Sequence, residues 1–204
     1  MESDASVFVL RGYTGKTTMV KVVADYITQS HHVVLMAPTG RAARILKQKT
    51  GHSAVTIHKT IYEKLCVVSK KVKDIAKSEF KFVFPIHVSD KEGNVVAIVG
   101  ESPMVCSRKI EHKLFAFGTG NLMEDLLAYV RPNFGGKIIF AGDPTQLPPV
   151  GKPVSNALKA EHFQERGFKV VEAELTEVLH QKSDSIILKN AMIIRDLLKK
   201  EKRI

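Results

Sequence analysis

Residues 7–18 read VFVLRGYTGKTT, and this stretch decides the fold. Four apolar residues, from Val7 to Leu10, form a run typical of a buried parallel strand. A loop with two glycines follows, and apolar residues at helical spacing then continue over residues 16–29. A glycine loop between a strand and a helix N-terminus directs backbone N–H groups and the positive end of the helix dipole at an anion. The stretch therefore predicts a phosphate-binding loop at residues 12–18.

Two side chains in this loop match the chemistry of a nucleoside triphosphate site. Lys16 is placed to contact the β and γ phosphates, and the Thr17 hydroxyl is placed to bind Mg²⁺. The spacing is shorter than usual, because only Tyr13 and Thr14 separate Gly12 from Gly15, where four residues are standard. A glycine turn that merely precedes a helix is the alternative interpretation.

The rest of the chain predicts an α/β fold with a mostly parallel sheet and helices on both faces. Residues 32–36 (HVVLM) and 137–141 (KIIFA) read as further buried strands, and residues 41–49 and 122–130 read as helices. Residues 82–88 and 94–99 are β-rich runs around 89–93, a composition typical of a hairpin loop. We expect that hairpin to belong to an insertion at about residues 66–98. A last strand at 175–179 and an amphipathic helix at 185–200 are also expected.

One side of the first helix is predicted to be apolar. Its members are Met19, Val22, Val23, Tyr26 and Ile27.

Charge and composition set the broad class. Lys plus Arg is 31 against 21 Asp plus Glu, a formal net charge of +10, which fits either a polyanionic partner or a solvated basic surface. Cys66 and Cys106 have no metal-ligand spacing and read as reduced thiols. The sequence shows neither a signal peptide nor an apolar run of membrane-spanning length, so we expect a soluble cytoplasmic protein without a membrane partner.

Two more segments carry polar side chains directly after apolar strands. Gly100 and Glu101 follow the run NVVAIV, where phosphate-loop enzymes place acids for Mg²⁺ and for water activation. The second segment, GDPTQLPPV at residues 142–150, contains three prolines that stiffen the loop and present Gln146 at a fixed point. An amide there can hydrogen-bond a γ-phosphate or an attacking water at the end of the sheet, where ligands bind in open α/β folds.

In this order the motifs resemble those of superfamily 1 DNA helicases of the RecD and Dda branch, which translocate 5′-to-3′ on single-stranded DNA. The resemblance rests on six segments and covers about residues 7–198. They are VFVLRGYTGKTT, APTGRAA (37–43), TIHK (56–59), IVGESPM (98–104), GDPTQLPPVG (142–151) and LTEVLHQ (175–181). It implies that residues 1–180 form the first RecA-like motor domain of a P-loop NTPase. Residues 181–204 would begin the connection to a second motor domain that this sequence lacks.

The resemblance also implies a role for each matching residue. Lys16, Glu101 and Gln146 would be catalytic, with Glu101 activating water and Gln146 sensing the γ-phosphate. Thr17 would hold Mg²⁺. The DNA contacts would come from Thr39, Gly40, Arg41 and His58. The remaining contacts to ATP would come from Gly12, Thr14, Gly15, Thr18, Asp143 and His180. Single-stranded DNA or a DNA junction would be the partner, and other chains of a DNA-processing complex would be further partners.

Three departures from the helicase pattern fall on catalytic positions. The phosphate loop is two residues short, Gly100 stands where an Asp would hold the metal, and His180 stands where an Arg would neutralise the γ-phosphate. Arginine fingers contribute about 10³–10⁵ in rate, and a largely neutral His does not replace one at pH 7. We therefore expect a fragment or a weakened copy of an ATP-dependent DNA helicase motor. A catalytically impaired domain that binds nucleic acid or a partner is the alternative, and an unrelated P-loop kinase is disfavoured by GDPTQLPPVG and TIHK.

Overall fold

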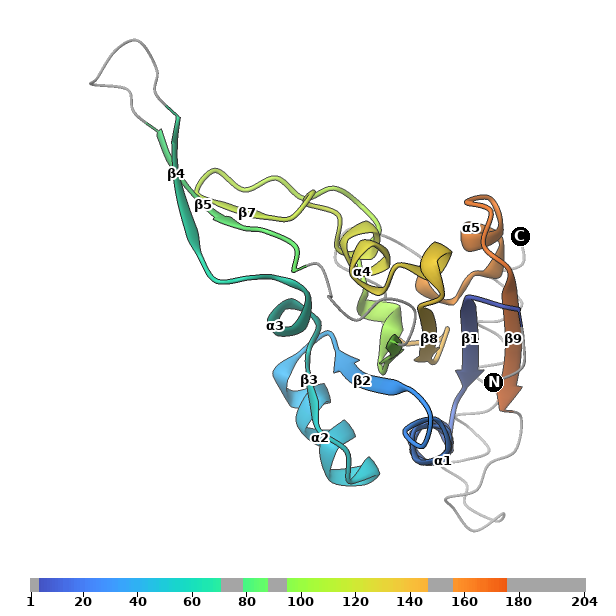
Figure 1. The fold of residues 1–204 in the computed structure, drawn as a ribbon. Helices are drawn as coiled ribbons and strands as arrows, with labels where there is room; N and C mark the ends of the chain where they lie inside the picture. Colours follow the sequence, from blue (N-terminus) through green and yellow to red (C-terminus); the bar gives the residue numbers. More distant parts are fainter. Residues whose placement is uncertain (1–3, 71–78, 88–94, 147–155, 176–204) are drawn as a thin grey trace.

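A six-stranded parallel sheet forms the centre of the molecule (Figure 1). The computed structural model describes residues 4–70, 79–87, 95–146 and 156–175. The strand order is β3-β2-β6-β8-β1-β9, so the first strand lies between two strands from the end of the described chain. The strands are β1 (Val7–Gly12), β2 (His32–Ala37), β3 (Ala54–Thr56), β6 (Val95–Val99), β8 (Lys137–Gly142) and β9 (Val170–Leu175).

Helices cover both faces of this sheet, which confirms the predicted α/β architecture. On one face, α1 (Lys16–Ile27) and α2 (Gly40–Thr50) pack on side chains such as Leu10 and Ile98. The other face carries α3 (Ile57–Ile61), α4 (Leu122–Val130) and α5 (Ala160–Gln164). Successive residues of β6 and β8 alternate between the two cores, as the period of a strand requires.

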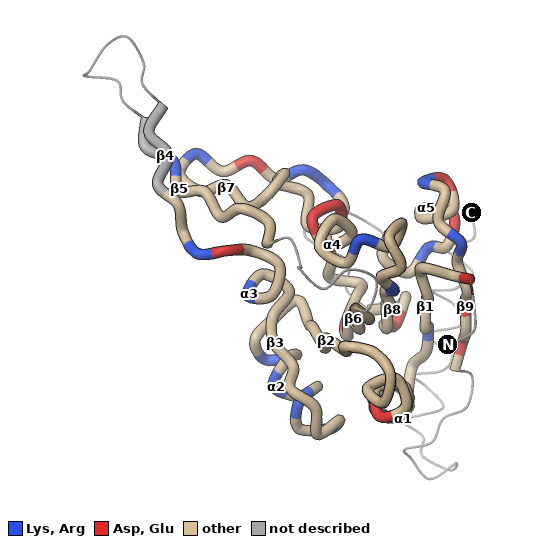
Figure 2. The backbone as a smooth tube through the Cα atoms, in the orientation of Figure 1, with Lys and Arg blue, Asp and Glu red and all other residues tan. Residues whose placement is uncertain are grey.

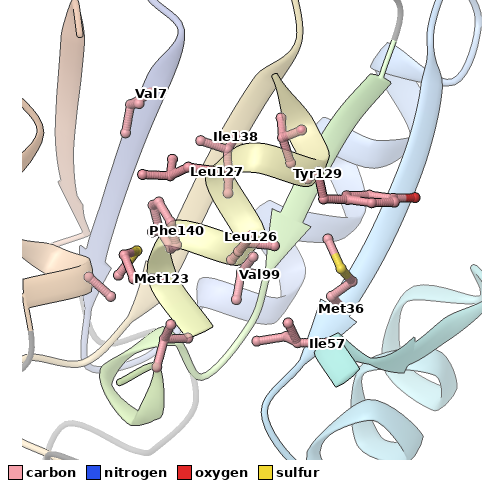
Figure 3. Packing of buried hydrophobic residues seen from close by; sticks show 14 of the residues in the cluster. Val7, Met36, Ile57, Val99, Met123, Leu126, Leu127, Tyr129, Ile138 and Phe140 are labelled. Carbon is pink, nitrogen blue, oxygen red and sulfur yellow. The ribbon is translucent and has the colours of Figure 1, made fainter. Parts of the chain in front are cut away.

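Large apolar side chains fill the core under α4 (Figure 3). Met123 and Leu126 of α4 lie against Phe140 of β8 and Val99 of β6, and all four are fully buried. Burying one such side chain stabilises the fold by about 1.5–3 kcal/mol relative to leaving it in water. The helix has the predicted bounds, because Asn121 caps its start through hydrogen bonds from Met123 N and Glu124 N, and Pro132 follows its end.

The buried side of α1 differs from the predicted one. Val20, Ala24 and Ile27 face the sheet, whereas Met19, Val22 and Tyr26 are 38%, 57% and 65% exposed. The reason is the close approach of helix and sheet at Ala24, whose side chain is fully buried. A small residue permits this contact, and the hydrophobic spacing alone does not mark it.

A second sheet of three strands extends away from the central one (Figure 1). It consists of β4 (Cys66–Lys70), β5 (Glu79–Phe84) and β7 (Phe115–Phe117), with β5 antiparallel to β4 and parallel to β7. The predicted pairing across residues 89–93 was wrong, since β6 joins the central sheet between β2 and β8. All five residues of β6 are buried, as expected for a strand covered on both faces rather than for a hairpin arm.

A buried carboxylate on α4 connects the end of α3 to the segment after β7. Asp125 of α4 is fully buried and accepts a hydrogen bond from the Tyr62 hydroxyl at 2.7 Å. Its other oxygen accepts from Thr119 N at 3.0 Å and from Thr119 Oγ1 at 2.7 Å. Close by, the ring of Phe117 lies 5.3 Å from that of Tyr62 and stacks on Phe84 of β5 at 4.5 Å. The contacts tie β5 and β7 to α3 and α4.

No helix in the described residues is long and apolar enough to cross a bilayer.

Candidate nucleotide and nucleic-acid site

The phosphate loop forms the turn between β1 and α1. Gly15 has φ 75°, in the left-handed region that glycine adopts without strain, and α1 begins at the next residue. No side-chain hydrogen bond caps the start of this helix. Lys16 Nζ donates to the carbonyls of Gly12 at 2.7 Å and Tyr13 at 3.2 Å, so the ammonium group folds over its own loop. An uncapped helix N-terminus beside a lysine is suited to binding an anion.

A cavity of about 260 Å³ opens beside this loop, at the carboxyl ends of the central strands. Five predicted site residues line it: Lys16, Thr17, Thr39, Arg41 and Glu101. Much of the remaining wall consists of apolar side chains, which were not predicted from the sequence to line a site. It includes Val20 of α1, Ile45 and Leu46 of α2, and Met104. The structure thus brings the predicted nucleotide loop and the predicted DNA-contacting segment to one cavity.

The end of β6 forms the floor of the cavity. Gly100 N donates to Met36 O at 2.9 Å, which fixes this position beside β2. A Cβ atom at Gly100 would meet Leu46 Cδ2 at 3.3 Å, so the space in front of Gly100 is bounded by a leucine. Glu101 follows with φ 52° and ψ 39°, a left-handed conformation that is uncommon outside glycine and turns the chain sharply into the 3₁₀ turn at Ser102–Met104.

The loop after β8 holds Asp143 and Gln146. Asp143 is almost fully buried, and its Oδ1 accepts hydrogen bonds from Thr145 N at 2.9 Å and Thr145 Oγ1 at 2.7 Å. The carboxylate therefore shapes the loop. Gln146 is exposed, its N–H bonds to Asp143 O at 3.1 Å, and it does not line the cavity described above. Close packing of this loop on the 3₁₀ turn requires Gly142, because a Cβ there would lie 2.3 Å from Pro103 Cδ.

The basic residues of α2 form its basic face, and Figure 2 marks their positions along the helix in blue. The helix carries four exposed cations and no acid: Arg41, Arg44, Lys47 and Lys49. Thr39 caps it by accepting a hydrogen bond from Ala42 N at 3.2 Å, so this hydroxyl already serves the helix start. Gly40 is exposed, and a Cβ there would meet no atom within 4 Å. The arrangement offers a row of cations to a polyanion.

His58 lies apart from the cavity, on α3. Its ring centroid is 5.5 Å from those of Tyr62 and Phe117, so it belongs to the aromatic contacts between the two sheets. Burial of part of the ring lowers the pKa of His58, although the Asp125 carboxylate counteracts this effect. The imidazole is therefore neutral at pH 7. His180 lies outside the described residues, as do the predicted strand beyond Leu175 and the predicted helix at 185–200.

The remaining predicted residues surround the phosphate loop itself. Gly12 ends β1, where a Cβ would approach Leu175 Cβ to 2.9 Å. Thr14 is half-buried in the loop, and Thr18 is exposed on the first turn of α1. The hydrogen bond between Asp125 and Tyr62 was not predicted from the sequence. An acid within the otherwise apolar stretch LMEDLLAYV was the signal that could have marked it.

The fold is that of an α/β P-loop domain, with the candidate loop between a parallel strand and a helix. The chain belongs to the AAA domain family (AAA_30), whose model matches residues 1–197. Its fold resembles that of Pif1 helicase from Bacteroides, with TM-score 0.52, 20% identity, and coverage of 92% of this chain and 41% of that one. A Pif1 helicase structure described as unwinding forked double-stranded DNA gives TM-score 0.50 and 19% identity, over 92% of this chain and 43% of that one.

A protein from Methanocaldococcus jannaschii, the uncharacterized protein MJ1519, is 30% identical over 146 residues. The match covers 68% of this chain but 11% of that protein. This chain therefore spans less than half of each of these relatives.

Proposed function

We propose that the chain is an ATP-binding motor domain of a superfamily 1 DNA helicase, most similar in its motifs to the RecD and Dda branch. The observation that carries the proposal is the shared cavity. Lys16 and Thr17 of the phosphate loop and Thr39 and Arg41 of the basic helix line one space together with Glu101. In such motors nucleotide and DNA sites must communicate, and a common wall gives them a direct route.

In this proposal α1 and the phosphate loop bind the triphosphate. The uncapped N–H groups of α1 and the ammonium of Lys16 contact phosphate oxygens, Lys16 having left its carbonyl partners Gly12 and Tyr13. Glu101 acts on the attacking water, and Gln146, exposed after β8, is free to reach the γ-phosphate. Mg²⁺, when bound, offsets phosphate charge, and Thr17 is the loop residue that would hold it. Asp143 supports the Gln146 loop through Thr145.

Single-stranded DNA is the proposed polyanion for the basic face of α2. Arg41, Arg44, Lys47 and Lys49 are exposed on one short helix without an acidic neighbour in it, and the whole chain carries +10. Phosphate contacts of this kind bind without reading sequence. The similar fold of a Pif1 helicase that unwinds forked DNA supports this choice of partner.

A second candidate is a binding domain that no longer hydrolyses ATP. This candidate is favoured by the absence of an acid at Gly100. The side chain of Leu46 borders the space where a metal-holding acid is expected. Such a domain would retain the basic face and bind DNA or another chain of a DNA-processing complex.

One set of measurements separates the two. ATP binding and single-stranded-DNA-stimulated hydrolysis are compared for the wild type, Lys16→Ala and Lys21→Ala. Lys21 lies on the same helix but is exposed and pairs with Asp25, so it serves as the matched control. We expect hydrolysis that disappears in Lys16→Ala and persists in Lys21→Ala. Salt-dependent DNA binding without hydrolysis in all three proteins would instead support the binding domain.

A further inference from the structure

The position of Gly100 changes what the site can offer a metal ion. In P-loop NTPases, Mg²⁺ is held by the loop Ser or Thr hydroxyl and by a carboxylate at the end of a neighbouring strand. Here that strand end is Gly100, and the space a side chain would enter is bounded by Leu46 at 3.3 Å. Mg²⁺ requires a near-octahedral shell of oxygen ligands and keeps several of its waters. A leucine side chain can neither coordinate the ion nor hydrogen-bond its waters.

Among the described residues, the carboxylates that follow β6 and β8 do not replace the missing one. Asp143 follows the neighbouring strand β8, but it is buried and its Oδ1 accepts two hydrogen bonds from Thr145. Glu101 lines the cavity, but in the proposed function its carboxylate acts on the attacking water rather than on the metal. Thr17 alone remains of the usual pair of metal-holding groups, so the residues present do not fit a firmly held Mg²⁺.

Fixed cations occupy the same cavity instead. Lys16 and Arg41 both line it, one from each of the two helices that cover this face. The uncapped N-terminus of α1 adds backbone N–H groups and a positive dipole end. These groups can offset triphosphate charge without an ion. We infer that ATP binding at this site does not depend on Mg²⁺. This inference rests on the proposed nucleotide site, and it specifies which groups offset the negative charge of the triphosphate there.

The test is a comparison of ATP affinity with and without the ion. Binding of ATP to the full chain is measured by isothermal titration calorimetry, once in excess MgCl₂ and once in excess EDTA. We expect the two dissociation constants to agree within about threefold, which corresponds to about 0.7 kcal/mol. Lys16→Ala should weaken binding in both buffers by the same factor, because its ammonium acts on the phosphates directly.

A matched pair of substitutions probes the missing carboxylate. Gly100→Asp restores an acid at the end of β6, whereas Gly100→Asn fills the same space with a neutral amide and meets Leu46 in the same way. The aspartate variant should bind ATP at least about tenfold more tightly in MgCl₂ than in EDTA, since a bare carboxylate repels the phosphates. The asparagine variant should bind equally in both buffers. Thermal unfolding of both variants checks that the fold is intact.

The outcomes distinguish the inference from the function on which it rests. A wild-type affinity that falls about tenfold or more in EDTA would overturn the inference and leave the nucleotide site standing. Absence of ATP binding in both buffers would overturn the proposed nucleotide site, and the inference with it.

Discussion

Replacing Asp125 by alanine should cost far more stability than replacing the residue beside it. The Tyr62 hydroxyl is buried and donates to Asp125 at 2.7 Å, so it would lose its acceptor, which costs about 1–3 kcal/mol. Thr119 is exposed, and water can replace the two hydrogen bonds that it donates. The vacated carboxylate volume adds about 1 kcal/mol. We therefore expect Asp125→Ala to lower the free energy of unfolding by about 2–4 kcal/mol.

Glu124 is the control for this prediction. It precedes Asp125 on α4, but its side chain is 41% exposed and pairs with Arg166 at the surface. An exposed pair contributes about 0–1 kcal/mol, so Glu124→Ala should fall in that range. Urea unfolding followed by circular dichroism measures both variants, provided that the slope with denaturant is unchanged.

A double-mutant cycle isolates the Asp125–Tyr62 contact. In the Tyr62→Phe background no hydroxyl is left to lose its acceptor, so Asp125→Ala should cost about 1–2 kcal/mol less than in the wild type. Equal costs for the Asp125 and Glu124 substitutions, or an additive cycle, would refute the reasoning.

Three other predictions follow from single positions. Gly142→Ala should destabilise the fold by about 1–3 kcal/mol in urea unfolding, because the new methyl group would overlap the ring of Pro103; a neutral result would contradict that packing. Arg41→Ala should reduce the slope of log affinity for single-stranded DNA against log salt by about 1. His58→Ala should leave this slope unchanged, because burial lowers the pKa of His58 and the ring carries no charge to lose. Equal slopes for the wild type and both variants would show that the phosphate contact lies elsewhere. Burial and the Asp125 contact raise the pKa of Tyr62 above its value in the unfolded chain. As pH rises past about 10 the unfolded chain loses this proton first, so the stability of the fold should fall. Thermal unfolding across pH should show a smaller alkaline decline for Tyr62→Phe than for the wild type.

The sequence predicted strands β1, β2 and β8 of the central sheet because their signals are local. Uninterrupted apolar runs marked β1, β2 and β8, and the cap and proline around residues 122–130 marked α4. Loop chemistry at Gly15 and Lys16 placed the phosphate loop. Each of these features depends on neighbours in the chain, which a single sequence displays.

Features that depend on distant partners were harder to predict. The hydrophobic spacing of α1 is satisfied by two different faces, and only the approach of the sheet to Ala24 decides between them. Strand β9 is an edge strand with exposed residues between its ends, and its apolar signal is correspondingly weak. The apolar wall at Leu46 could not be inferred either, because it arises from the contact of α2 with the end of β6.

The place of β1 in the sheet has a consequence for how the chain acquires its structure. Val7 is paired with Ile138 on one side and with Val170 on the other. The first strand therefore pairs only with segments that are synthesised more than a hundred residues later. Contacts over such separations slow folding, and a ribosome adds only about 5–20 residues per second. During synthesis the emerging N-terminal segment therefore remains without its sheet partners until β8 and β9 have left the ribosome. The phosphate loop is synthesised before β8 and β9, and in that interval the apolar strand that carries it is exposed to binding by chaperones.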